Sequence, residues 1–169
     1  MNKFSFLFAF IFLMTFQVDA QKIGYLNSQE IMTAMPEVKQ ANSDIEDMKS
    51  MITKKGQEMI QTLQAKYQEL QRKQQSGELA PIEIEKQAAA LKTEEESIVK
   101  FEQTSQQQVI DKSTELLGPI EQKVNQAIKD VAKEMGYLYI FDSAMGTVLY
   151  ADPSTDVTKS VAAKLGITL

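Results

Sequence analysis

Three aspartates near the C-terminus are the residues whose type and spacing most invite chemistry. Asp142, Asp152 and Asp156 could bind calcium or serve as general acid and base, because carboxylates do both. Their spacing matches no calcium-binding loop, and no partner base accompanies them. We therefore interpret Asp152 as the start of a turn at Pro153 and Asp156 as the cap of the last helix.

Composition argues against most other catalytic and metal-binding classes. The 169 residues include no His and no Cys, so the commonest general base, the thiol nucleophile and most transition-metal ligands are absent. No glycine-rich loop ends in Gly-Lys-Ser/Thr, so no nucleotide site is expected. A net charge of −5 disfavours nucleic acid or anionic lipid as a partner held by bulk charge. We expect no enzyme, metal or cofactor.

Residues 1–20 have the pattern of a secretory signal peptide. Lys3 precedes an apolar run over residues 4–16, and Val18, Asp19 and Ala20 supply a cleavage site near Ala20. The run is shorter than the roughly 20 apolar residues that a transmembrane helix needs. We expect export and a soluble mature chain, whose net charge remains −5 because Lys3 and Asp19 leave together.

Most of the remaining chain has helical periodicity. Apolar or small residues recur every three or four positions, which predicts one buried stripe along a long helix. We call this stripe the seam, and its residues are Val38, Ala41, Ile45, Met48, Ile52, Gly56, Met59, Leu63, Tyr67 and Leu70. We expect Ser28 to cap this stretch and Pro36 to restart it. Gly77 and Pro81 predict a hairpin tip, and a second helix follows, bent at Gly118-Pro119. About forty residues per arm reach roughly 60 Å, so the hairpin must project.

Three short segments have β-strand patterns: KIGYLN at 22–27, YLYIFD at 137–142 and TVLYA at 147–151. Two helices of equal length would return the chain to its start, so we expect the first strand to run antiparallel to the one leaving the hairpin. The last two segments predict a β-hairpin, with Tyr139 and Tyr150 facing each other or lying in the core. A final short helix should carry Val157, Val161 and Leu165 on one apolar face and stop at Gly166.

The sequence thus predicts an α+β protein with a helical arm and a small β-rich body. Residues 36–118 would form the arm, and residues 21–35 and 119–169 the body. About forty residues of strands and one short helix are too few for an independent core, and their sheet edges would stay open. We therefore expect several copies to share one β core.

The order of these parts resembles the Skp/OmpH family of periplasmic chaperones. The specific resemblance lies in residues 127–167, with Gly-Tyr at 136–137, VLYADPS at 148–154 and DVT at 156–158. It implies a jellyfish-shaped trimer with a β-barrel body and three coiled-coil tentacles around a cavity. It also implies binding of unfolded outer-membrane proteins without ATP. Family members that contact lipopolysaccharide are basic, whereas this chain has a pI near 4.9, so we carry over no lipopolysaccharide or lipid site.

Methionines and other apolar residues near the predicted seam are the candidate client-binding residues, because flexible thioethers suit varied apolar partners. The candidates are Met48, Met51, Met59, Ile60, Val99, Phe101 and Ile110. Met48 and Met59 could instead fill the seam, and the others could pack against the partner helix. Charged residues such as Lys54, Glu58 and Arg72 could steer clients or simply solvate the helices. The alternative function is a structural or adaptor coiled coil of the cell envelope with one defined partner.

Overall fold

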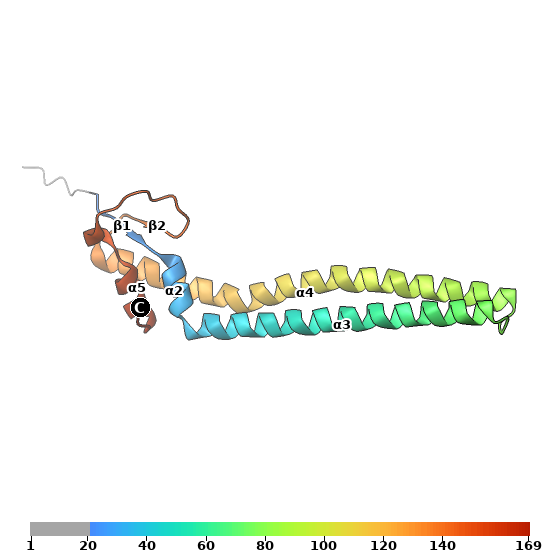
Figure 1. Ribbon diagram of the computed structural model, residues 1–169. Coiled ribbons are helices and arrows are strands. Elements are labelled where there is room, and N and C mark those ends of the chain that lie inside the picture. Colours follow the sequence, from blue (N-terminus) through green and yellow to red (C-terminus); the bar gives the residue numbers. More distant parts are fainter. Residues whose placement is uncertain (1–20) are drawn as a thin grey trace, which may run out of the picture.

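A computed structural model describes residues 21–169 and shows two long helices lying side by side on a small body (Figure 1). The order is β1 (Ile23–Leu26), α2 (Ser28–Ala34), α3 (Pro36–Gln75), α4 (Pro81–Met135), β2 (Tyr139–Asp142), η1 (Pro153–Thr155) and α5 (Thr158–Leu165). The α+β class and the long antiparallel helical hairpin are confirmed. The predicted signal peptide, residues 1–20, lies outside the described residues.

Local sequence signals set the ends of the arm helices. Met35 is extended, with ψ 125°, and α3 begins directly after it at Pro36, so the predicted restart is confirmed. At the tip, Gly77 has φ 71°, and Pro81 opens α4. The prediction of Ser28 as the first cap is wrong, because the Asn27 side chain accepts the Glu30 N–H. Helix α4 continues without a break through Gly118-Pro119, with Pro119 inside the helix, so the bend predicted there does not interrupt it.

The arm seam is buried at intervals rather than continuously. Val38, Ala41 and Ile45 are buried near the base, and Leu70 of α3 and Leu91 of α4 are buried towards the tip. Between these levels most seam residues are half-buried. Two helices without a third layer can cover only a narrow stripe, so the flanks of the arm remain accessible.

The main core lies where the arm meets the body. Five side chains there are 0–2 % exposed: Leu26, Ile31, Met35, Val157 and Val161. They pack with Val38, Val124, Ala127, Val131 and Tyr137, so the core joins β1, α2 and α5 to the bases of both arm helices. Val157 and Val161 of the predicted apolar face are thus buried, and the predicted glycine stop at Gly166, with φ 75°, is confirmed.

The predicted antiparallel pairing is wrong: β1 and β2 are parallel, with Ile23 opposite Tyr139 and Leu26 opposite Asp142. The arm helices are not equal in length, since α4 has 55 residues and α3 has 40. Helix α4 therefore runs past the start of α3 and beside β1. Gly136 then reverses the chain with φ 71°, so β2 leaves in the same direction as β1.

The predicted β-hairpin is also wrong. Residues 147–151 form no strand within the described chain, and β2 turns at Ser143 into a loop that leads to η1. Tyr139 and Tyr150 are 58 % and 84 % exposed, so neither lies in the core of a single chain. Tyr139 instead stacks on Phe141, its neighbour on the same face of β2, with ring centroids 6.4 Å apart.

Candidate functional site

Asp142 joins β2 to the start of α2. Its carboxylate accepts hydrogen bonds from the Ser28 hydroxyl at 2.5 Å, the Ser28 N–H at 3.1 Å and the Ala144 N–H at 3.0 Å. Burial alone would raise the pKa of Asp142, but these hydrogen bonds outweigh it and the net shift is downwards. The ionised side chain is therefore a structural acceptor that fixes α2 against the sheet.

The other two aspartates accept hydrogen bonds from nearby backbone N–H groups. The prediction for Asp152 is confirmed, whereas the prediction of Asp156 as the cap of the last helix is wrong, because Val157 is the N-cap of α5. Asp152 accepts the Ser154 N–H at 2.9 Å at the start of η1, and Asp156 accepts the Thr158 N–H at 2.8 Å at the start of α5. Across residues 21–169 no three acidic side chains gather in a way that could hold a metal ion. The acidic residues that first invited chemistry therefore have local structural partners.

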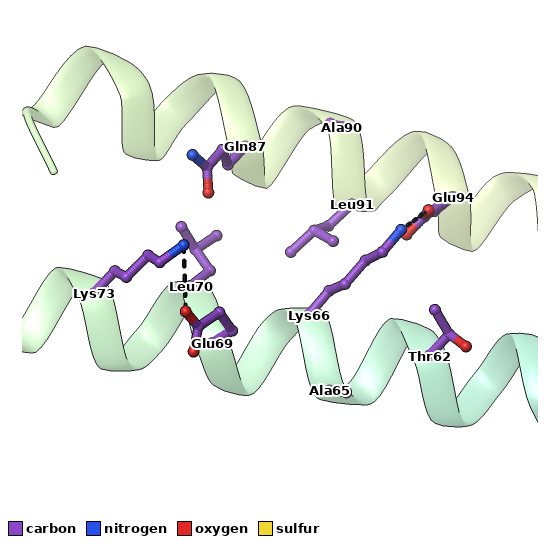
Figure 2. Close-up of a pocket in the computed structure, with 10 residues that line it drawn as sticks. All are labelled: Thr62, Ala65, Lys66, Glu69, Leu70, Lys73, Gln87, Ala90, Leu91 and Glu94. Carbon is purple, nitrogen blue, oxygen red and sulfur yellow. Dashed lines mark hydrogen bonds and ion pairs between the residues drawn. The ribbon is translucent and has the colours of Figure 1, made fainter.

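The arm carries grooves along the line where its helices meet. Figure 2 shows the one nearest the tip, of about 610 Å³, with Leu70 and Leu91 reaching into the space between α3 and α4. Charged side chains flank these leucines: Lys66 pairs with Glu94 across the helices, and Lys73 lies 3.2 Å from Glu69. Hydrogen bonds from Arg72 and Lys73 lower the pKa of Glu69 to about 2, so the Glu69 carboxylate stays ionised well below neutral pH.

A second groove, of about 490 Å³, lies nearer the middle of the arm. Ile52, Gly56 and Ile60 of α3 line it together with Phe101 and Val109 of α4. The Phe101 ring packs over Gly56, at 3.7 Å from where a Cβ would be, which is an ordinary van der Waals contact. Ser105 also lines this groove, and its buried Oγ has no hydrogen-bond partner among residues 21–169.

The predicted contact residues divide into two groups. Met48, Met59 and Phe101 are half-buried in the seam. The other four predicted residues are exposed on the arm: Met51, Ile60, Val99 and Ile110, at 67, 39, 50 and 57 % exposure. Sequence reasoning placed Tyr67 in the seam, but it is 41 % exposed. Tyr67 follows Leu63 by four positions and precedes Leu70 by three, and such steps place all three residues on one helix face, so the pattern contains no signal that would have separated Tyr67 from the seam.

The body exposes a second apolar surface. Its most exposed large side chains lie directly before β2, on β2 and in the loop after it: Leu138, Tyr139, Phe141, Met145, Leu149 and Tyr150. Leu149 is 97 % exposed, which is unusual for a leucine in a segment of such β-strand character. None of the helices in residues 21–169 has the length and apolarity needed to cross a membrane.

The model of one protein family, described as outer membrane protein (OmpH-like), matches residues 22–165. The chain belongs to this OmpH-like family. The match takes in both the arm and the body, so the resemblance seen in the sequence is confirmed.

Two known OmpH-like proteins show how far the similarity extends. The chaperone protein Skp of Yersinia enterocolitica is 28 % identical over 149 residues, which cover 85 % of each chain. A crystal structure of an OmpH-like outer membrane chaperone from Caulobacter crescentus superposes with a TM-score of 0.73 at 19 % identity. It covers 86 % of this chain and 84 % of its own, so the two share the fold.

Proposed function

We propose that this OmpH-like protein is an ATP-independent holdase chaperone of the periplasm that binds unfolded outer-membrane proteins and prevents their aggregation. The observation that carries the proposal is the projecting two-helix arm, which exposes apolar side chains along its length. Membership of the OmpH-like family and the similarity to Skp support it. The proposed contact residues are the exposed Met51, Ile60, Val99 and Ile110, together with Met48, Met59 and Phe101 at the seam.

A homotrimer would give such shallow surfaces useful affinity. A client that engages one arm meets the neighbouring arms at high effective concentration, so several weak contacts act together. In the described part of the chain β2 pairs with β1 alone and its outer edge is open, whereas Tyr25 of β1 also bridges to Asp156. The loop after β2 exposes Leu149 and Tyr150. Association of several bodies would cover both features, which supports assembly through residues 21–35 and 119–169.

The proposed working cycle needs no cofactor. Release would follow when the client gains more free energy by folding or by inserting into the membrane than it gains on the arms. The acidic net charge of −5 argues against lipopolysaccharide or anionic lipid as a partner, and also against nucleic acid.

Sedimentation velocity of the purified protein, with and without a urea-denatured outer-membrane β-barrel protein, tests assembly and binding together. We expect a trimer alone, a soluble complex with the client, and suppression of client aggregation in proportion to trimers. A stable monomer that leaves aggregation unchanged would contradict the proposal. Binding of one folded envelope protein, with no binding of several unrelated unfolded clients, would favour the adaptor alternative.

A further inference from the structure

Lys22 ties the beginning of the described chain to the body. Its carbonyl oxygen accepts the Leu138 N–H at 2.8 Å, and its ammonium group donates to the Met135 carbonyl oxygen at 2.9 Å. The same ammonium group lies over the Tyr137 ring, 4.3 Å from the ring centroid. These contacts join Lys22 to the end of α4 and to the segment that leads into β2, and β1 follows directly at Ile23. Lys22 is therefore the first residue of the described chain that the body holds.

Gln21 lies just outside these contacts. It is exposed and belongs to no helix or strand, and no hydrogen bond among residues 21–169 engages it. In the sequence it follows Val18, Asp19 and Ala20, and Val18 and Ala20 are the small residues typical of a signal-peptide cleavage site. Cleavage after Ala20 leaves Gln21 as the N-terminal residue, one position before the residue that the body holds.

An N-terminal glutamine carries a nucleophile and an electrophile that can react with each other. A fraction of α-amino groups, on the order of a tenth, is uncharged at neutral pH. The uncharged nitrogen can attack Cδ of its own side chain, which closes a five-membered ring without a second molecule. A new bond from the α-nitrogen to Cδ replaces the bond from Cδ to Nε2. The α-nitrogen gives up one proton, and Nε2 takes it and leaves as ammonia, so nothing is oxidised or reduced.

We propose that the exported chain begins at Gln21 and that this residue cyclises to pyroglutamate. The inference rests on the export to the periplasm that belongs to the proposed function. Within the described chain the body holds neither the side chain nor the main chain of Gln21, so the amine and the amide are free to meet. The reaction removes the positive charge of the terminus and leaves the contacts of Lys22 in place.

The ring protects the first strand from aminopeptidases. Strand β1 has four residues, and its first residue, Ile23, is only two positions after Gln21. Stepwise removal of two residues would take away Lys22 and its contacts with Met135, Tyr137 and Leu138. Aminopeptidases bind the free α-amine of their substrates, and a pyroglutamyl terminus has none. The modified chain therefore keeps the residue that ties β1 to the end of α4.

The mass of the intact protein tests the inference. The full chain of 169 residues is produced in a Gram-negative bacterium and purified from its periplasm. We expect the mass of residues 21–169 less about 17 Da, the mass of ammonia, in a share of molecules that grows as the protein ages at neutral pH. Cleavage after Glu30 gives the peptide 21–30, whose fragment ions separate Gln21 from the exposed Gln29. The loss should map to Gln21, because the α-nitrogen of Gln29 is part of a peptide bond.

Gln21→Ala is the matched variant, because it keeps the residues before the cleavage site and removes only the reacting amide. It should keep the full mass of its residues 21–169 however long it is aged. Treated with a broad-specificity aminopeptidase, the variant should lose residue 21 and then residue 22, whereas the cyclised wild type should keep its mass. Pyroglutamyl peptidase should remove the ring from the wild type and leave Lys22 as a free N-terminus. Equal resistance of the variant to the aminopeptidase would refute the protective role.

Other outcomes separate this inference from the function it rests on. An exported chain with a different first residue, an aged protein with an unaltered mass, or ammonia lost from another glutamine would each overturn the inference alone. If the chain keeps residues 1–20 and stays in the cytoplasm, the proposed periplasmic function fails and the inference fails with it. If the terminus is cyclised but the protein does not suppress aggregation of a denatured β-barrel protein, the chaperone proposal fails and the inference is upheld.

Discussion

Replacing Gly24 by alanine should destabilise the body severely for so small a change. A Cβ at this position would lie 2.8 Å from Cε1 of Tyr137 and 3.1 Å from the backbone oxygen of Thr155. The Thr155 oxygen belongs to η1, and the Tyr137 ring is buried under the Lys22 ammonium, 4.3 Å from its centroid. Because neither neighbour can shift freely, we expect the free energy of unfolding to fall by about 2–3 kcal/mol, near the upper end of the range for overpacked cores.

Urea unfolding at one fixed protein concentration, followed by circular dichroism, measures this loss. Gly118→Ala is the matched control, since nothing lies within 4 Å of its added Cβ and the residue is inside α4. It should stabilise the protein by about 0.5–1 kcal/mol. Tyr137→Leu should relieve part of the Gly24→Ala penalty in a double-mutant cycle. Wild-type stability of Gly24→Ala, or strict additivity with Tyr137→Leu, would refute the contact geometry.

Three further changes test other parts of the structure. The pKa of Asp142 is lowered in the folded protein, so its ionised form stabilises the fold at neutral pH, and this stabilisation is lost as the pH falls through the lowered pKa. In Asp142→Asn, the free energy of unfolding should therefore fall less steeply at acid pH than in the wild type. An unchanged curve of stability against pH would contradict this. Ser105→Ala removes a buried hydroxyl without a partner and should raise the free energy of unfolding by up to about 1 kcal/mol, whereas a measured loss would reveal a missed hydrogen bond. Ile31→Ala truncates a fully buried side chain and should cost about 2–5 kcal/mol in thermal unfolding, while a smaller cost would mean that the core collapses around the gap.

The helices could be predicted from sequence because their signals are local. Pro36 and Pro81 open helices, Gly77 and Gly136 sit in left-handed turns just past helix ends, and the apolar period marks the seam. Each of these signals acts within a few residues, so nothing distant can cancel it.

The direction of the strand pairing could not be predicted from any local pattern, because it depends on the relative lengths of the two arm helices. Its direction follows from how far α4 extends beyond the base of α3 before Gly136 reverses the chain. The prediction of a strand at residues 147–151 was wrong for another reason. A β-strand pattern shows that a segment can form a strand, but it does not supply a neighbouring strand, and the described part of a single chain has none for this segment. The candidate contact residues stay a prediction. Averaged spacing could not show that Met59 is half-buried in the seam while Ile60, beside it, is exposed.

The antiparallel arm also sets an order in which the chain can fold. Near the tip, Lys66 and Glu94 pair across only 28 residues of sequence, while Glu37 and Lys123 at the base are separated by 86. Closing the larger loop costs about 1 kcal/mol more in chain entropy. The hydrogen bond from Asn27 to Thr158 spans 131 residues, so β1 emerges first during synthesis yet finds its neighbours last. We expect the arm to zip from tip to base and the body to form at the end, leaving the first strand unpaired until almost the whole chain is present.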